Sequence, residues 1–525
     1  MTRFLCLALL NALLHAQVAG NSASALFSRG MSLARSNNLA QAADIFEEGA
    51  RLFPADKRFP LELAGIAWRE KDGSKAKRYL HQSLQIDPQD TYGNDFLATL
   101  YLFDHNAEAA LKYWNRVNKP LIETLRFEPD PPLSLVLRDR TFDISAGQVF
   151  TLKRLETSWA NLNRLDVLNE VRFDLVPRPD DRFDLAIRAI PTIQPLGGWL
   201  GRVLPMLREL PYQGIDVESD DIRRNALNFT SLWRWDPDKR RVNLSMSGPL
   251  HSNPREEFRY FVDARDETWD LLPTTYRGGL NNLLVRRTEA GASYELGLSP
   301  RLQWTLGGVL KYRDYGNEPA GAFFQKGWSA ELNNRFDYLL WTWPDHRIRL
   351  NTRALLNTGH LFAASPARLI TARAGLVGEW RPSAKGNTYR LAEQTQVGRI
   401  FGNAPLDELF MLGMERDNET GLWLRGISGA YEGRKGSAPL GREYAISQTD
   451  FERKLFQIPF IRLEAGTFFD VGSVGDHSGQ FGSHGVLYAT GVQVQVKTVS
   501  GVHVKLVYGR DLVSGLGVFY TGVSR

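Results

Sequence analysis

The feature that most constrains the fold is a period-two alternation of apolar and polar residues that recurs through residues 226–525. In "TGVQVQVKT" (residues 490–498) three valines alternate with polar residues, and in "HRIRLNTRALL" three arginines and an asparagine share one face. Successive side chains of a strand point to opposite faces, so this period indicates β-strands. About fourteen such segments are visible by eye, and two more strands fit within 271–288 and 409–424.

Alternation alone fits a soluble β-sandwich as well as a barrel in lipid, because both structures bury one face of each strand. Aromatic residues gather near the ends of several segments, as in "LWRW", "YLLWTW" and "YFVDARDETW". Aromatic girdles are typical of membrane barrels, in which every strand edge is paired. We therefore expect residues 226–525 to form a closed transmembrane antiparallel β-barrel of about 14–16 strands, with a soluble β-sandwich as the alternative.

The first residues have the pattern of a secretory signal. Arg3 supplies the positive start, residues 4–14 form an apolar run and small residues follow, so residues 1–25 are expected to be a cleaved signal peptide. No later segment has the ~18 continuous apolar residues that a membrane helix needs. The one cysteine, Cys6, lies inside the signal, so we expect no disulfide, thiolate catalysis or cysteine metal site in the mature chain.

Residues 26–120 contain an internal repeat with a period of 34 residues. Small side chains at fixed positions let paired helices approach closely, and each unit buries its apolar face on the next. The pattern resembles tetratricopeptide (TPR) repeats, which implies a surface for a periplasmic protein partner and no chemistry. A helical bundle with an accidental period is the alternative. Three sets of residues follow this spacing: Gly30, Ala64 and Ala98; Ala42, Ala76 and Ala110; Phe46, Leu80 and Trp114.

Residues 133–191 predict a small α+β module. "LSLVLRD" is predicted to be a strand, "TLKRLETSWANLNRLDVLNEV" has leucines at helical spacing, and "EVRFDLV" and "RFDLAIRAI" flank the turn "PRPDD". This order resembles one polypeptide-transport-associated (POTRA) domain. Its sheet edge could pair with an extended client segment, or the module could be a spacer. Residues 192–225 are expected to be a linker that includes an interfacial or packing helix, "GWLGRVLPMLREL".

A long connection rich in glycine and arginine, "GLWLRGISGAYEGRKGSAPLGREY" (residues 421–444), separates two strand-like segments. Ordered loops of this length are uncommon and usually functional. Its "WLRGI" resembles the Arg-Gly tip of the sixth loop in the BamA/TamA/FhaC superfamily of outer-membrane barrels, and "FFDVGSV" (residues 468–474) resembles that family's Phe-x-Asp-x-Gly strand motif. The resemblance, with the POTRA-like module, covers residues 133–525; the repeats are additional.

The resemblance implies a salt bridge inside the barrel. In the family the loop arginine folds into the lumen and meets the strand aspartate, which here are Arg425 and Asp470. Gly426 would allow the tight loop tip and Gly472 a close backbone approach. We call these four residues the lumen lock. Inward parity adds Arg462 and Glu464 as further candidates for the same cluster, and Asp450 and Glu452 on the preceding strand are weaker ones. An exposed arginine-rich loop is the alternative.

The resemblance also implies function. We expect a bacterial outer-membrane protein with periplasmic N-terminal domains that takes part in assembly, insertion or translocation of other proteins. Its first strand (Ala226–Trp235) and last strand (Leu516–Ser524) would meet at a seam whose edges pair with a client strand. The expected partners are client outer-membrane or secreted proteins, a periplasmic protein bound by the repeats, and outer-membrane lipid. A passive pore or structural barrel is the alternative.

The sequence gives no case for an enzyme. The nine histidines are scattered; His477 and His484 share one loop, "DHSGQFGSH", which suits a solvated turn better than a metal site. No nucleophile elbow and no phosphate-binding glycine loop occurs at the required spacing. We therefore expect no catalytic residue, no metal and no cofactor. The net charge of +5 is small for 525 residues and does not indicate a nucleic-acid partner.

Overall fold

The computed structural model describes residues 22–191, 207–222, 224–363, 366–383, 386, 388–415, 421–458, 461–477, 479–483, 485–498 and 503–524. Most of the predicted signal peptide, residues 192–206 of the predicted linker and His484 lie outside these residues. The chain divides into two compact units. The first comprises the residues up to Glu123 with Gly147–Leu152 and Pro177–Phe183, and the second comprises the remainder.

The first unit is built of antiparallel helices that follow the 34-residue period. Helical residues 22–35 precede α2 (Leu39–Leu52), α3 (Arg58–Arg69), α4 (Gly73–Ile86), α5 (Thr91–Phe103) and α6 (Ala107–Trp114). Asp72 and Asn106, one period apart, each accept a hydrogen bond from the backbone N–H three residues later, which caps α4 and α6. The small residues of the repeat lie at helix contacts: Ala42, Ala64, Ala76, Ala98 and Ala110 are fully buried.

The α+β module has the element order β1 (Ile122–Phe127), α7 (Leu135–Phe142), α8 (Leu152–Leu165), β2 (Leu168–Pro177) and β3 (Phe183–Pro191), with β3 central in its sheet. The prediction of a strand at "LSLVLRD" is wrong, because this segment forms α7. Ser134 has extended backbone angles at the N-cap, and Leu137 is buried. A short apolar run fits a helix and a strand equally well, and the strand of this module lies earlier, in β1.

The second unit contains a rolled antiparallel sheet that begins earlier than predicted. Its first strand, β4 (Gly214–Ile222), lies in the segment predicted to be a linker, and a short 3-10 helix, η2 (Leu207–Tyr212), precedes it. The expected first strand therefore corresponds to β5. The other long strands are β5 (Leu227–Arg234), β6 (Lys239–Leu250), β7 (Asn253–Leu271), β8 (Leu280–Gly297), β9 (Leu302–Gly316), β10 (Gly327–Trp343), β11 (Ile348–Phe362), β12 (Ala367–Trp380), β13 (Tyr389–Gly402), β18 (Glu443–Ile458), β19 (Ile461–Gly475), β20 (Leu487–Thr498), β21 (His503–Asp511) and β22 (Gly517–Ser524).

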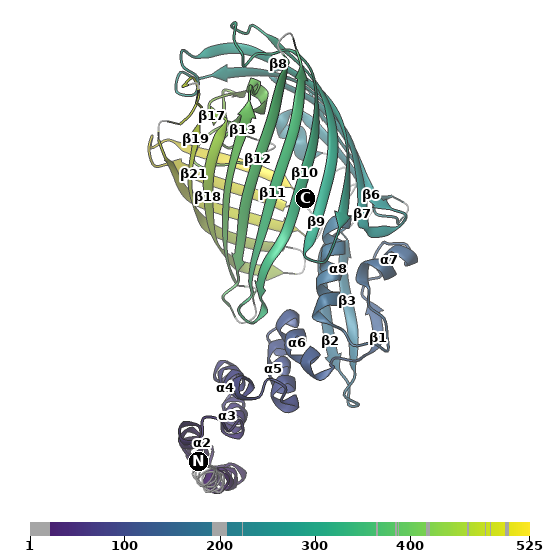
Figure 1. The fold of residues 1–525 in the computed structure, drawn as a ribbon, viewed down its shortest axis with the longest axis vertical. Helices are drawn as coiled ribbons and strands as arrows, with labels where there is room; N and C mark the ends of the chain where they lie inside the picture. Colours follow the sequence, from purple (N-terminus) through teal and green to yellow (C-terminus); the bar gives the residue numbers. More distant parts are fainter. Residues whose placement is uncertain are drawn as a thin grey trace, which may run out of the picture. The chain divides into compact units, whose positions relative to one another are not determined.

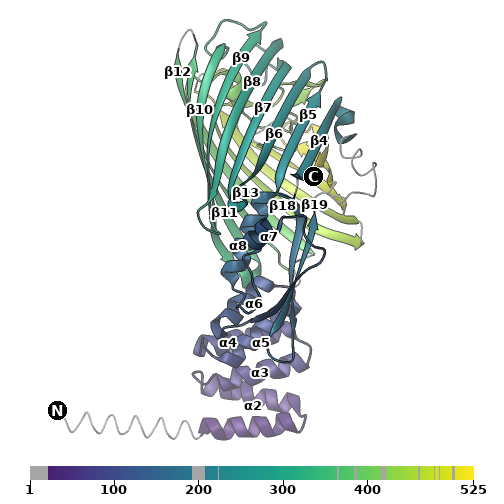
Figure 2. The same ribbon diagram turned by 90° about the vertical axis from the view of Figure 1, so that its right-hand side faces the viewer.

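These strands curl into a barrel (Figures 1 and 2). Each long strand pairs antiparallel with the next long strand along the chain from β4 to β22, with β13 pairing directly to β18. In the strand order β22 is followed by β4. Among the described residues, the residue-by-residue registers run from β4 to β22.

The two faces of the sheet differ in the way the alternation predicts. On β9, Leu310 and Tyr312 are 57% and 43% exposed, whereas the neighbouring Lys311 and Arg313 point to the inside and form ion pairs, with Arg313 fully buried. The outside of β10 carries exposed Trp328, Phe336 and Trp341. Charged residues inside and apolar residues outside are the reverse of a soluble β-sandwich. Among the helices that the structure describes, none has the length and apolar character to cross a membrane.

Candidate functional site inside the barrel

The site is built by the connection between β13 and β18, which we call the inner loop (residues 403–442). It contains η4 (Leu406–Glu408) and four two-residue strands, β14 (Phe410–Met411), β15 (Ala430–Tyr431), β16 (Arg434–Lys435) and β17 (Leu440–Gly441). β14 pairs with β17, and β15 pairs with β16. Its side chains contact β7, β9 and β19, and its backbone lies on β21. A segment reaches all these strands only from the barrel interior, so the alternative of an exposed loop is wrong.

Arg425 at the loop tip contacts Asp470 of β19 through three donors. Its Nε lies 2.9 Å from Asp470 Oδ2, its Nη2 lies 2.5 Å from Oδ1, and its backbone N–H donates to Oδ2 at 2.9 Å. Arg425 is 4% exposed and Asp470 is fully buried. The bidentate geometry matches the fork of a guanidinium to a carboxylate. Because both charges are buried, loss of either one removes the main compensation of the other.

Two further groups complete the arginine's surroundings. Arg425 Nη1 donates to Asp450 of β18 and to Gln493 of β20, the latter at 3.3 Å. The Arg425 guanidinium also lies over the ring of Phe468, 4.0 Å from its centroid, which is a cation–π contact. Glu452 does not contact Arg425 directly. It accepts hydrogen bonds from Gln493 at 2.9 Å and from Arg390 at 2.9 Å, so it belongs to the same network one step removed.

Arg462 and Glu464 do not join this cluster. Arg462 Nη2 lies 2.5 Å from Glu464 Oε1, and Lys497 lies 2.9 Å from the same carboxylate. Arg462 and Lys497 both pair with Glu464 on the barrel wall, away from the loop tip. The alternation along β19 predicted that Arg462 and Glu464 point inward, but it did not predict how far along the barrel axis they lie from the loop tip. Glu464 precedes Asp470 by six residues on β19, a distance of about 20 Å along a strand.

Glycines let the loop backbone lie directly on the barrel wall. A Cβ on Gly426 would lie 2.5 Å from the carbonyl carbon of Arg510, and a Cβ on Gly509 of β21 would lie 1.9 Å from the carbonyl oxygen of Arg425. Gly472 is also crowded, with Leu424 at 3.3 Å from its would-be Cβ. Side chains of other residues would separate the loop tip from the strands, so these glycines bring Arg425 within reach of Asp470.

Sequence reasoning missed Phe468, Gln493 and Gly509. Phe468 begins the quoted strand motif and shares the face of Asp470, and Gln493 lies on the polar face of its strand. The alternation of inward and outward side chains therefore indicated that both residues point into the barrel. Gly509 had no comparable signal. It faces the loop only because residues far apart in the chain, Arg425 and β21, meet in the folded barrel.

A second set of ion pairs fixes the inner loop to the opposite part of the wall. Arg313 of β9, fully buried, lies 2.7 Å from Glu408 and 3.2 Å from Asp407 of η4. Lys311 lies 3.0 Å from Glu408, and the Tyr315 hydroxyl donates to Asp407 at 2.5 Å. We call these residues the η4 anchor. No motif in the sequence predicted it, because its acids and bases lie about ninety residues apart.

Two more ion pairs hold the loop near β6 and β7. Lys435 of β16 lies 2.7 Å from Glu267 of β7, and both side chains are buried. Lys239 of β6 lies 3.0 Å from Glu415 of the loop. With Arg425 on β19 and η4 on β9, the inner loop is thus fixed at points around the barrel wall.

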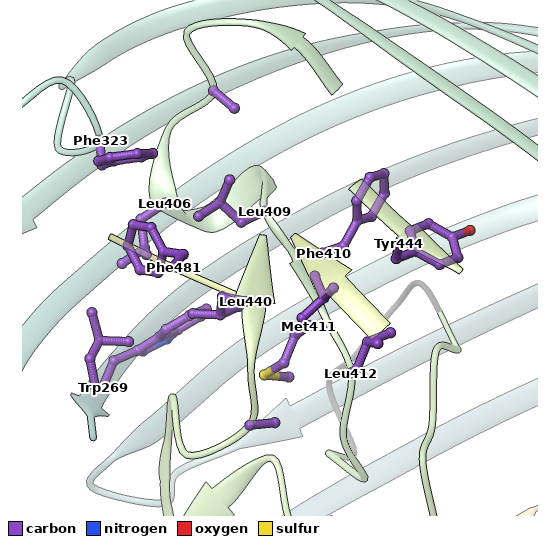
Figure 3. Close-up of a cluster of buried hydrophobic side chains, with 14 of the residues drawn as sticks. Trp269, Phe323, Leu406, Leu409, Phe410, Met411, Leu412, Leu440, Tyr444 and Phe481 are labelled. Atoms are coloured by element: carbon purple, nitrogen blue, oxygen red, sulfur yellow. The ribbon is translucent and has the colours of Figure 1, made fainter. Parts of the chain in front are cut away.

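An apolar cluster also packs the loop inside the barrel (Figure 3). Phe410 of the loop meets Tyr444 of β18 with ring centroids 4.6 Å apart, and Phe323 meets Phe481 at 4.9 Å. Leu406, Leu409, Met411, Leu412 and Leu440 of the inner loop are buried in the same cluster. The barrel interior around the inner loop therefore contains a packed apolar core as well as polar groups.

Within the described ranges no group of histidine, cysteine, aspartate or glutamate side chains has the arrangement of a metal site. His477, one of the two histidines predicted to lie in a solvated turn, is exposed and contacts Arg399 and Glu443.

Comparisons with known proteins identify solved structures of similar architecture. No protein-family model and no curated protein matches the sequence. BamA from Haemophilus ducreyi lacking POTRA domains 1–3 matches at 12% identity, over 77% of this chain and 84% of that chain, with a TM-score of 0.44. CdiB from Escherichia coli matches at 14% identity, over 77% and 75%, with a TM-score of 0.46. CdiB from Acinetobacter baumannii matches at 11% identity, over 82% and 86%, with a TM-score of 0.42. The chain is thus similar to solved BamA and CdiB structures.

Proposed function

We propose that this chain is an outer-membrane barrel of the BamA/TamA/FhaC type that takes part in the assembly, insertion or translocation of other proteins. The observation that carries the proposal is the buried pair of Arg425 and Asp470. It joins the two motifs that resemble this family, the Arg-Gly loop tip and the Phe-x-Asp-x-Gly strand, in the contact that the resemblance implies.

The outer membrane is the proposed location. Exposed aromatic and aliphatic side chains cover the outside of strands such as β9 and β10, while charged side chains line the inside. Burying such an apolar outer surface in lipid contributes about 25 cal/mol per Å², and its exposure to water would favour aggregation. The secretory pattern in residues 1–25 supports the same location, with the repeats and the α+β module in the periplasm.

In this proposal the lumen lock keeps the inner loop seated and so fixes the curvature of the strands near the seam. Arg425 connects to β18, β19 and β20 through Asp450, Asp470 and Gln493, and Gly426 lies on β21. Three consecutive wall strands are therefore coupled to one guanidinium, and the backbone of the loop tip lies on a fourth. The last strand of the wall, β22, is the next strand along.

The seam is the proposed client site. If few hydrogen bonds close the seam, its strand edges can pair with an extended client segment. In lipid each unpaired backbone group costs several kcal/mol, so pairing with a client strand is strongly favoured. No nucleotide is required, because the client's own hydrogen bonds and burial supply the driving force.

The helical repeats are proposed to bind a client or periplasmic partner protein. Trp68 and Phe103, at the ends of α3 and α5, stack with centroids 5.7 Å apart and an interplanar angle of 9°. Both side chains are exposed, at 41% and 59%. Paired exposed aromatic rings are typical anchors of protein interfaces.

A passive pore is the less favoured function. The inner loop is fixed by ion pairs to several parts of the wall, and its apolar residues form a packed cluster inside the barrel. Such a plug opposes steady ion flow. No observation on the described residues favours an open channel.

Depletion of the chain in its native host tests the proposal. We expect the amounts of several other outer-membrane proteins to fall severalfold, with their unfolded precursors accumulating in the periplasm. The control is re-expression of the unaltered chain, which restores those amounts. Unchanged outer-membrane proteins, together with steady ion conductance of the purified chain, would contradict the assembly function and support the pore.

A further inference from the structure

One guanidinium on the inner wall of the barrel has no acidic partner among the described residues. On β12, Ala374 and Leu376 are exposed on the outside, so Arg373, with the opposite parity, points into the barrel. Its Nε atom is buried and has no hydrogen-bond partner in the described part of the chain. Buried polar groups are normally satisfied, and a buried cation without a counter-charge is costly. Arg373 therefore differs from the paired arginines of the lumen lock and the η4 anchor.

The groups that act on the charge of Arg373 are Tyr444 and Arg353. Neither supplies a negative charge, because a tyrosine is neutral at pH 7 and Arg353 is a cation that already pairs with Asp337. Arg373 and Tyr444 meet over Gly398 of β13, which lies opposite both of them. A Cβ on Gly398 would lie 2.4 Å from the Tyr444 ring and 2.9 Å from Arg373 Cγ. The Tyr444 hydroxyl is buried, with no hydrogen-bond partner of acceptable geometry among the described residues.

Two asparagine amides lie beside this pair. Asn357 of β11 is the diagonal neighbour of Arg373 in the strand register, and Asn333 of β10 lies directly opposite Asn357. Diagonal neighbours are about 7–8 Å apart, which is within reach of a long side chain. The Oδ1 atoms of both asparagines are buried without a partner in the described part of the chain. The polar groups that need a partner are thus gathered in one region of the inner wall.

The inner wall below this region is open toward the end of the barrel that carries the α+β module. Val377, which points inward like Arg373, is 36% exposed, and the side chain of Arg353 is 64% exposed. Both lie nearer than Arg373 to the strand ends at which Arg301 pairs with Glu156 of α8. Arg373, Asn333 and Asn357 are themselves only half-buried. A ligand in the lumen therefore has access to them.

We propose that the inner wall at Arg373 is a binding site for an oxyanion, either a carboxylate or a phosphate group. A guanidinium fork binds two oxygens of such a group at once. The Arg373 guanidinium supplies the counter-charge, the Tyr444 hydroxyl donates to the anion, and the amide of Asn357 binds polar atoms beside it. We call these three residues the Arg373 site. Anion binding at this site needs no client, so it goes beyond the proposed assembly function.

Equilibrium dialysis of the full chain in non-ionic detergent tests the site. The probes are radiolabelled inorganic phosphate and a radiolabelled peptide of four glycines around one aspartate, blocked at both ends. The asparagine version of the peptide controls for binding of its backbone alone. Arg373→Gln removes the guanidinium, and Tyr444→Phe removes only the hydroxyl. Arg353→Gln is the matched control, because Arg353 points into the same lumen but already pairs with Asp337.

We expect saturable binding of phosphate, of the aspartate peptide or of both. Arg373→Gln should weaken this binding roughly tenfold or more, because charge-assisted hydrogen bonds are lost. Tyr444→Phe should weaken it severalfold, and Arg353→Gln by less than about twofold. Binding of phosphate alone supports the site with a free anion as its ligand, and binding of the aspartate peptide alone supports it with an acidic side chain.

Three results overturn the inference. The first is that neither probe binds saturably. The second is that Arg353→Gln and Arg373→Gln weaken binding equally, which indicates diffuse charge instead of a site. The third is that phosphate does not bind and the asparagine peptide binds as tightly as the aspartate peptide.

Stability without added anion gives an independent readout, followed by tryptophan fluorescence in the same detergent during heating. A half-buried guanidinium without a counter-charge carries a desolvation cost, so Arg373→Gln should unfold at the same temperature as the unaltered chain or at a higher one. The bound probe should raise the unfolding temperature of the unaltered chain and leave that of Arg373→Gln unchanged. A lower unfolding temperature of Arg373→Gln in anion-free buffer would show that Arg373 already has a partner within the protein, which overturns the inference.

Discussion

At the scale of single residues, the structure depends on one guanidinium with several buried partners. Arg425 is held by Asp470 and Asp450, and its plane lies on Phe468. A lysine could supply the charge but not the bidentate fork or the planar contact. The stabilisation therefore depends on residue type as well as on charge, and it can be tested by removing the charge of the acid while keeping its shape.

The first prediction concerns Asp470→Asn. The substitution leaves the Arg425 guanidinium buried with a weakened partner, which costs about 3–5 kcal/mol. We expect the inner loop of the purified protein to be cleaved by protease much faster than in the unaltered chain. Asp337→Asn is the matched control, because Asp337 pairs with the exposed Arg353 and such pairs contribute about 0–1 kcal/mol. Equal cleavage in the two variants would show that the pair does not seat the loop.

The second prediction concerns Gly509→Ala. Its Cβ would lie 1.9 Å from the Arg425 carbonyl oxygen, a backbone atom that cannot move away without lifting the loop tip. We expect this variant to resemble Asp470→Asn in protease sensitivity. Gly308→Ala on β9 is the control, since its Cβ meets nothing within 4 Å. If Gly509→Ala behaves like Gly308→Ala, the backbone contact between loop and β21 is absent in solution.

At the scale of elements, the sequence predicted helices and strands correctly where the apolar residues follow one clear period. The prediction failed where a segment fits the period of a helix and that of a strand equally well. The alanines of the repeat and the alternation of β20 were read correctly, because each fixes a face of its element. The segment of α7 was assigned to a strand, since its short apolar run has no distinctive period. β4 was assigned to a linker: its acids obscure the alternation of Ile215 and Val217, and only the pairing with β5 makes it a strand.

The site followed the same rule. Arg425 and Asp470 were found from motif resemblance and parity, and Asp450 was a weaker candidate on the preceding strand. The η4 anchor was not found, because Arg313 and Asp407 are brought together only by the path of the inner loop across the barrel. Periodicity predicts which face of its element a side chain lies on. To predict a pair of residues far apart in the chain, one would also need the register of every strand between them.

The third prediction tests the close helix contacts in the repeats. A Cβ on Gly49 of α2 would lie 2.2 Å from the ring of Phe59, which is fully buried. Gly49→Ala should therefore destabilise the helical unit by about 1–3 kcal/mol, measured as an earlier loss of helical circular dichroism in urea. Gly65→Ala on α3 meets nothing within 4 Å and should stabilise it by about 0.5–1 kcal/mol. Stabilisation by Gly49→Ala, or destabilisation by Gly65→Ala, would contradict the packing described.

At the scale of the whole molecule, the inner loop determines what the barrel can do. Its ion pairs to β6, β7, β9 and β19 and its apolar cluster turn a hollow cylinder into a plugged one. Such a plug opposes the passage of solutes through the middle of the barrel.

The fourth prediction follows for conductance. The unaltered chain in a planar lipid bilayer should show low conductance, because the loop fills the interior. Arg313→Ala removes the buried partner of Asp407 and Glu408, so the loop end carrying η4 should leave the wall and conductance should rise severalfold. Lys326→Ala, which removes an exposed pair with Glu318, should leave conductance unchanged. A high conductance of the unaltered chain would argue against the plug.

The most direct test of the central claim is reconstitution of the full chain into lipid vesicles with an unfolded outer-membrane β-barrel protein as client. Folding of the client is followed by its heat-modifiable gel mobility. The account predicts that vesicles containing the chain fold the client several times faster than empty vesicles, and that Asp470→Asn loses most of this acceleration. Equal folding rates in vesicles with and without the chain would contradict it.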